Sequence, residues 1–163
     1  MNAPMMLSPE SLAKIDKAIT KYPPNQRQSA VMAALTVAQD EKGWISTETM
    51  DFVAQYLGMP PIAVYEAATF YAMYDLQPVG RNKITICTNL PCALSGAADA
   101  AEHLKKKLGI GFNETTPDGG FTLKEGECLG ACGDAPVCLH NDKKMLSFMT
   151  PDKLDALIEE LRT

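Results

Sequence analysis

Apolar positions in the first half of the chain recur with the spacing of helices. Leu12, Ile15 and Ile19 form one such stripe, and proline and glycine residues separate it from the stripes that follow. The pattern predicts four helices. The first is capped by Ser8 and stops at Pro23-Pro24, and the second runs from about Arg27 to Glu41, before Gly43. The third is capped by Ser46 and stops at Gly58, and the fourth starts after Pro60-Pro61 and runs through Tyr74.

The second half alternates strand-like and helical patterns. Lys83–Ile86 reads as a short strand that Cys87 ends, and an Ala-rich helix follows from Ser95 to Leu108. Three further runs complete the pattern, namely a strand with Phe121 and Leu123, a hairpin of Val137–His140 with Met145–Phe148, and a helix that begins at Thr150. The order predicts an α+β protein with an N-terminal helical bundle at residues 1–78 and a small helix-covered sheet at residues 79–163.

Composition limits the classes of partner. The net charge is −5, which gives no electrostatic footprint for nucleic acid or for an anionic membrane surface. No apolar run approaches the ~20 residues of a membrane span, and Met1–Leu7 has neither the basic start nor the apolar stretch of a secretory signal. We therefore expect a protein of the bacterial cytoplasm with no direct membrane insertion.

The cysteines are concentrated in one part of the sequence, since all five fall between Cys87 and Cys138. Cys87 and Cys92 are separated by four residues, and Cys128 and Cys132 by three. Both pairs follow a strand-like run, so we expect both in loops at one end of the sheet. Four thiolates are the usual ligands of an iron–sulfur cluster, and the glycines near the second pair let backbone amides approach the sulfurs. We also expect Cys92 to lie just before a helix, whose N-terminal dipole favours a thiolate.

Three other interpretations of these cysteines remain open. A structural zinc site also takes four thiolates but commonly uses Cys-x-x-Cys knuckles, and neither pair has that spacing. The same difference weighs against a thioredoxin-type dithiol enzyme. Unconnected buried thiols are the third possibility, and Cys138 fits it best because it alternates with Val137 and Leu139 in a strand. The two histidines, His103 and His140, lie outside both pairs and do not suggest a Rieske centre.

The cysteine motifs resemble those of a known family. The segment Cys87–Cys92 reads Cys-Thr-Asn-Leu-Pro-Cys, and Glu127–Cys132 reads Glu-Cys-Leu-Gly-Ala-Cys about 35 residues later. With Ala68–Tyr71 in the helical part, they resemble the 24 kDa subunit family of respiratory complex I, which is the E-type subunit of the bacterial NADH-quinone oxidoreductase. The resemblance implies a helical bundle followed by a thioredoxin-like ferredoxin domain, in which Cys87, Cys92, Cys128 and Cys132 bind one 2Fe–2S cluster.

The same resemblance implies a role inside a larger enzyme. The chain would exchange single electrons with FMN on an FMN- and NADH-binding flavoprotein, and would contact other peripheral-arm subunits at the cytoplasmic face of the inner membrane. The sequence has no nucleophile–base arrangement and no glycine-rich phosphate loop, so we expect no catalytic residue and no NADH or flavin site on this chain. Two other functions stay open, namely the equivalent diaphorase subunit of an NAD-dependent formate dehydrogenase or hydrogenase, and a zinc-stabilised or metal-free assembly module.

The aromatic stretch Phe70–Tyr74 is the last feature of note. We first of all expect its apolar residues to lie in the protein core, as part of the fourth predicted helix. Their number also suggests, as a hypothesis, that some of them dock a partner subunit.

Overall fold

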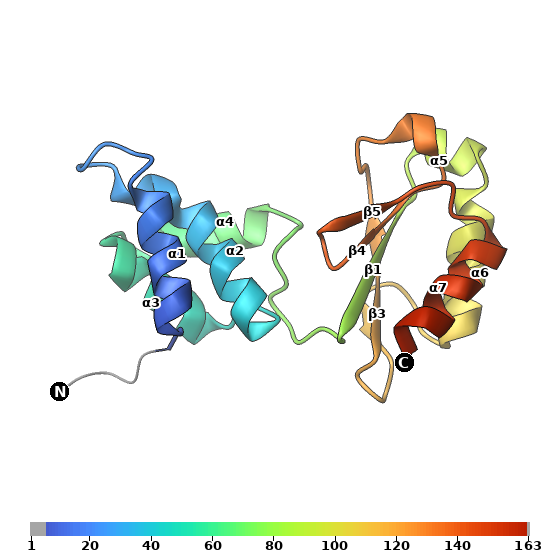
Figure 1. Ribbon diagram of the computed structural model, residues 1–163, viewed down its shortest axis with the longest axis horizontal. Helices are drawn as coiled ribbons and strands as arrows, with labels where there is room; N and C mark the ends of the chain where they lie inside the picture. The colour runs from blue at the N-terminus through green and yellow to red at the C-terminus, as the bar shows by residue number, and fades with distance from the viewer. Residues whose placement is uncertain (1–5, 163) are drawn as a thin grey trace. The chain divides into compact units, whose positions relative to one another are not determined.

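The computed structural model describes residues 6–162, so part of the Met1–Leu7 stretch used to predict the absence of a secretory signal lies outside the described residues. The chain divides into two compact units at the bond between Pro78 and Val79. The first is helical, and the second is a mixed sheet with helices (Figure 1). The predicted α+β class is therefore confirmed.

The helical unit begins and ends its helices largely where the sequence predicts. Its elements are α1 (Pro9–Ile19), η1 (Arg27–Ala30), α2 (Val31–Lys42), α3 (Thr47–Leu57) and α4 (Pro61–Phe70). Ser8 and Ser46 accept hydrogen bonds from the third amide of α1 and of α3, while Gly43 and Gly58 end α2 and α3 in the left-handed conformation. The largest side chains that are fully buried in this unit are Leu7, Ile15, Leu35, Ile45, Val53 and Val64.

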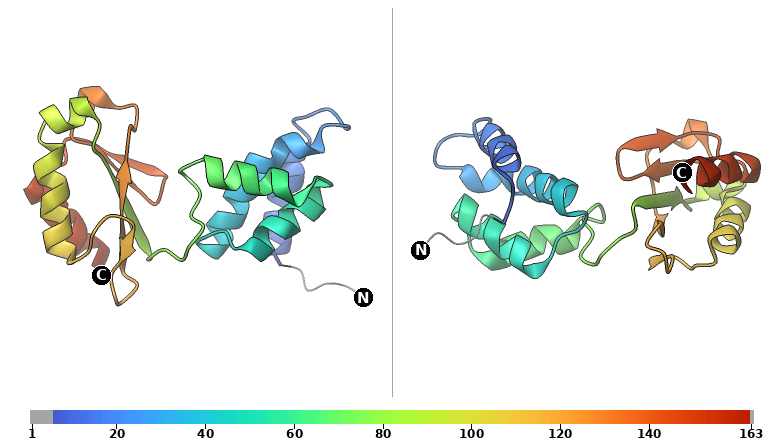
Figure 2. Two further views of the ribbon diagram at one scale, coloured as in Figure 1. Left: turned by 180° about the vertical axis from the view of Figure 1, so that it is seen from behind. Right: turned by 60° about the horizontal axis from the view of Figure 1, so that its bottom comes forward.

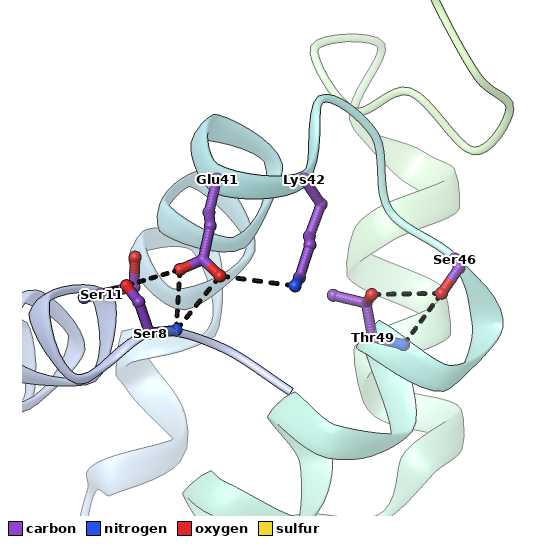
Figure 3. A network of polar contacts seen from close by, with 6 residues as sticks. All are labelled: Ser8, Ser11, Glu41, Lys42, Ser46 and Thr49. Carbon is purple, nitrogen blue, oxygen red and sulfur yellow. Dashed lines mark hydrogen bonds and ion pairs between the residues drawn. The ribbon is translucent and has the colours of Figure 1, made fainter. Parts of the chain in front are cut away.

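A carboxylate from one helix caps the start of another (Figure 3). Glu41, near the end of α2, accepts hydrogen bonds from the Ser8 amide at 3.0 and 3.1 Å and from the Ser8 hydroxyl at 2.9 Å. Together with the Ser11 side chain, these donors lower the pKa of Glu41 to about 2. The capping links α2 to the first turn of α1, where a negative charge is favoured by the helix dipole.

The fourth helix is shorter than predicted. It ends at Phe70, and Tyr71 has an extended backbone with φ −91° and ψ 117°. The chain then turns back along α2, where the Tyr74 hydroxyl donates to the Met32 carbonyl at 2.9 Å and Gln39 accepts from the Asp75 amide at 2.7 Å. These tertiary contacts replace the helix, although no proline or glycine marks its end. As a result Tyr74 is buried, while Phe70 is 80 % exposed.

The second unit is built on a five-stranded sheet with the order β2-β3-β1-β4-β5. Its elements are β1 (Asn82–Cys87), α5 (Leu90–Leu94), α6 (Ala97–Leu108), β2 (Glu114–Thr115), β3 (Phe121–Gly126), η2 (Cys132–Asp134), β4 (Cys138–His140), β5 (Lys144–Leu146) and α7 (Pro151–Arg162). The central strands β1 and β3 run parallel, and every other pairing is antiparallel. The two-residue strand β2 was not predicted.

Helices α6 and α7 pack against one face of this sheet (Figure 2). The core between them contains Ile84 and Leu123 from the parallel strands, and Leu104 and Ile158 from the helices, all fully buried. Each such side chain contributes about 1.5–3 kcal/mol by leaving water. The packed face fixes the register of β1 and β3, and therefore the position of the loops that leave their carboxyl ends.

Candidate metal centre

The two predicted cysteine loops leave neighbouring strands at the same end of the sheet. In the parallel pair Cys87 is the last residue of β1, and it lies opposite Gly126, the last residue of β3. Cys128 follows two residues after that strand end. A side chain at Gly126 would be crowded, because an added Cβ would lie 3.0 Å from Thr85 Cγ2 and 3.3 Å from Leu129 Cδ2. Its absence lets the second loop fold closely against the first.

Cys87 and Cys92 form the buried half of the site. Each is only 1 % exposed, and both pack with Ala97 and Val137. Three partly buried apolar residues cover this group, namely Leu129, Ala131 and Ala135. The Cys87 amide donates to the Val137 carbonyl at 3.0 Å. The thiols of the first loop are therefore fixed by strand pairing and packing.

Cys92 differs from its predicted setting in two ways. It lies inside the short helix α5, not before a longer one, and α6 begins separately at Ala97. Its pKa is raised, not lowered, because burial penalises the thiolate and a hydrogen bond with Cys87 favours the protonated thiol of Cys92. The Val137 amide opposes this by donating to the Cys92 sulfur. Desolvation is the largest of these effects on the Cys92 pKa. Binding of a metal would require this proton to leave.

Cys128 and Cys132 form the exposed half of the site. They flank Gly130, which has a φ of +72° and so adopts the left-handed conformation that reverses the chain between them. Cys132 begins the short η2 helix and is close enough to Cys92 for charge repulsion between the two to raise the Cys92 pKa. Both sequence neighbours of Cys128 contact the buried pair. The Glu127 carbonyl is 3.9 Å from Cys87 Sγ, and Leu129 packs against the buried cysteines.

The donor set has the chemistry of an iron–sulfur site. All five cysteines are free thiols, and thiolates are the ligands that iron–sulfur clusters take. The four cysteines of the two predicted pairs are present as one buried pair and one exposed pair, and each iron of a [2Fe–2S] cluster takes two protein ligands. Within residues 6–162, no three His, Cys, Asp or Glu side chains are gathered closely enough to bind one metal ion.

Cys138 is buried in the sheet core, as its alternation in the strand predicts. It is fully inaccessible, and burial raises its pKa to about 12, with Cys87 and Cys92 adding charge repulsion. Cys138 faces Ile86 across β1 and β4 and packs in the core that α6 and α7 cover. The structure therefore gives this thiol a packing role.

The histidines have structural partners. His103 Nε2 lies 2.8 Å from Asp155 Oδ1, which connects α6 to α7, and His140 Nε2 lies 3.0 Å from Asn82 Oδ1. Burial lowers the pKa of His140, which favours its neutral form. Neither interaction involves a thiol of the site.

Other residues of the site were not anticipated. The Val137 backbone, the Glu127 carbonyl and the pair Thr88–Glu125 all contact the cysteine loops or their strand ends. The first two act through backbone atoms, so no side-chain signal in the sequence could identify them. The third could be inferred from the parallel pairing of the strand ends, had that pairing been known.

Comparison with known proteins gives concordant results. The family described as thioredoxin-like [2Fe-2S] ferredoxin matches residues 15–162, across both units. The E-type subunit of NADH-quinone oxidoreductase from Rickettsia bellii (strain RML369-C) is 44 % identical over 94 % of this chain and 92 % of its own length. The mitochondrial NADH dehydrogenase [ubiquinone] flavoprotein 2 of Dictyostelium discoideum is 41 % identical over 96 % of this chain and 65 % of its own length.

The fold also recurs in a solved structure. One chain of an NAD⁺-reducing [NiFe]-hydrogenase in the H₂-reduced state superposes with a TM-score of 0.71 at 23 % identity. The match covers 81 % of this chain but only 22 % of the hydrogenase chain, so it concerns the fold alone. Among the helices that the structure describes, none has the length and apolar character needed to cross a bilayer.

Proposed function

We propose that this chain, which belongs to the thioredoxin-like [2Fe–2S] ferredoxin family, is an electron-transfer subunit of an NADH-oxidising complex. Within that family it is related to the E-type subunit of NADH-quinone oxidoreductase. Cys87, Cys92, Cys128 and Cys132 hold one [2Fe–2S] cluster. The observation that carries this proposal is that the segments bearing the two cysteine pairs continue from the adjacent ends of two paired parallel strands, with Cys87 opposite Gly126. When bound, the cluster supplies reversible one-electron chemistry.

The residues of this chain set the conditions for that chemistry. The buried pair anchors one side of the site, while Leu129, Ala131 and Ala135 exclude water from it. The Val137 amide donates to the Cys92 sulfur and so favours its thiolate. Glu125, Glu127 and Asp134 place negative charge near the loops in sequence, which favours a low reduction potential. We assign no catalytic residue to the chain.

The electrons exchange with FMN held by a partner flavoprotein, which also binds NADH. The chain joins this partner and other peripheral-arm subunits of respiratory complex I, at the cytoplasmic face of the bacterial inner membrane. The identity of 44 % with an E-type subunit over nearly the whole chain supports this assignment. Pull-down of the tagged full chain from its own cells tests it, since an NADH-oxidising flavoprotein containing FMN is expected among the captured subunits.

A second function stays open beside the first. The chain would then be the equivalent diaphorase subunit of an NAD-reducing hydrogenase or of an NAD-dependent formate dehydrogenase, and its fold recurs in an NAD⁺-reducing hydrogenase. The pull-down separates these possibilities, because a hydrogenase or formate dehydrogenase would co-purify in place of quinone-reducing subunits.

The cluster itself is tested on the isolated chain. Anaerobically reconstituted protein is expected to contain about two irons and two sulfides per chain and to give an S = ½ EPR signal after reduction, as a [2Fe–2S] cluster requires. Cys92→Ser should abolish that signal, and Cys138→Ala should keep it. Stoichiometric zinc without sulfide would instead identify a zinc-stabilised assembly module, and an unchanged signal in Cys92→Ser would contradict the ligand assignment.

A further inference from the structure

The two cysteine segments are connected by three hydrogen bonds where β1 and β3 stop pairing. The Thr88 amide donates to the Gly126 carbonyl at 2.9 Å. The Thr88 hydroxyl donates to Glu125 Oε1, also at 2.9 Å. The Cys87 thiol is directed at the Glu127 carbonyl, with 3.9 Å between sulfur and oxygen. Cys87, the last residue of β1, and Thr88, which follows it, thus contact the end of β3, from which the second cysteine loop departs.

One of these three bonds is incompatible with metal binding. A cysteine binds iron as a thiolate, which has no hydrogen to donate. The Glu127 carbonyl therefore loses its contact with Cys87 when that cysteine becomes a ligand. Both bonds of Thr88 are independent of the sulfur and persist. In the ligated protein, Thr88 therefore still connects the two cysteine segments, whereas the Cys87 thiol no longer does.

The position of this connection makes it sensitive. Thr88 directly follows Cys87, and Glu125 lies three residues before Cys128. A small slip between the two strand ends would therefore change the separation of the sulfurs, and a metal site needs its ligands within about 0.5 Å of the productive geometry. The bond from a hydroxyl to a carboxylate is charge-assisted, although the exposure of Glu125 weakens it.

We propose that Thr88 is a positioning residue that, through Glu125, keeps the Cys128–Cys132 loop in register with the buried pair once Cys87 is ligated. The identity of the bound group rests on the proposed function. Thr88 itself binds no metal and carries no electron. Its contribution is to hold the spacing of the two thiol pairs while the Cys87 contact is broken.

The test uses the full chain with a reconstituted cluster. Thr88→Val keeps the shape of the side chain but removes the hydroxyl, and Thr88→Ser restores it. Loss of the bond is expected to speed iron release to a ferrous chelator about three- to tenfold and to broaden the EPR signal, while Thr88→Ser stays within about twofold of the unchanged chain. Glu127→Gln is the matched control, since it removes a neighbouring exposed carboxylate without touching this bond.

A double-mutant cycle identifies the partner. Glu125→Ala should match Thr88→Val, and the double variant should be no worse than either single variant, because all three lack the same bond. Additive effects, or iron release from Thr88→Val at the unchanged rate, would overturn the proposal.

Hydrogen exchange on the cluster-free chain decides the same question independently of iron. The Thr88 amide, bonded to Gly126, is expected to exchange about threefold or more faster in Thr88→Val than in the unchanged chain. If the unchanged chain acquires no cluster, the proposed function fails, yet this measurement still shows whether Thr88 connects the segments. An unchanged exchange rate would refute the connection.

Discussion

Cys87 and Cys92 are buried in the second unit, whereas Cys128 and Cys132 are exposed on its surface, although both pairs belong to segments that continue from the adjacent ends of β1 and β3. The first pair is fixed by strand pairing, by α5 and by apolar packing. The second pair is carried by a loop whose path depends on a left-handed glycine and on a few hydrogen bonds. The difference defines a buried half and an exposed half, and on the proposed function it predicts that the first is fixed and the second is adjustable.

The largest expected contrast is in thiol reactivity. In the cluster-free chain at pH 8, the exposed thiols of Cys128 and Cys132 should react with iodoacetamide at least about a thousandfold faster than Cys138. Cys138 has a pKa of about 12, so only about one part in ten thousand of it is thiolate at pH 8. The rate at Cys138 should rise about tenfold per pH unit until the pH approaches that pKa. Mass spectrometry of quenched samples gives both rates. Comparable rates at pH 8 would mean that the buried and exposed thiols do not differ as described.

Ligand substitution tests the same contrast with the cluster present. Changes outside the ligand set typically lower metal affinity about 10–100-fold. Cys92→Ser should lower cluster occupancy by more than this, because the buried serine cannot move to replace the lost sulfur ligand. Cys132→Ser should retain a weaker and shifted EPR signal, since the exposed loop can bring the new oxygen towards iron. Iron, sulfide and EPR intensity measure the outcome. Equal losses would remove the distinction between a fixed and an adjustable half.

Stability without the cluster gives a smaller effect. Cys92→Ser places a hydroxyl in an apolar group and is expected to lower the free energy of unfolding of the second unit by about 1–3 kcal/mol. Cys128→Ser, at the surface, should change it by less than about 0.5 kcal/mol. Urea unfolding monitored by circular dichroism compares them. The expectation fails if the surface variant is the more destabilised.

The smallest expected effect concerns the turn in the exposed loop. Gly130→Ala should cost about 1 kcal/mol, because alanine is strained at a φ of +72°. Gly133→Ala is the matched control, since its φ is outside the left-handed region and an added Cβ meets no atom within 4 Å. The comparison uses the same unfolding assay, with cluster retention as a second readout. Equal costs for the two variants would show that the left-handed turn does not hold the loop.

Much of the local structure was predictable because its signals are local. Ser8 and Ser46 cap helices, Gly43 and Gly58 end them, and the run at Lys83–Ile86 is a strand. The burial of Cys138 also followed from simple alternation. Each of these depends on a residue and its near neighbours, which the sequence displays directly.

The features that were missed depend on distant contacts. The fourth helix ends at Phe70 because Tyr74 and Asp75 bind α2, about 40 residues earlier in the chain. The pKa of Cys92 is raised because tertiary packing buries it. The placement of both cysteine loops at one end of the sheet was inferred correctly, whereas the backbone groups that contact their sulfurs required knowledge of which strands pair.

The outer strands of the sheet, β2 and β5, limit how the chain can pair with other molecules. β2 has only two residues and β5 only three, and lysine occupies the first position of β5. Short or charged outer strands offer few free backbone groups to a strand from another molecule. The edges of this sheet are thus poor templates for the edge-to-edge strand pairing that leads to aggregation.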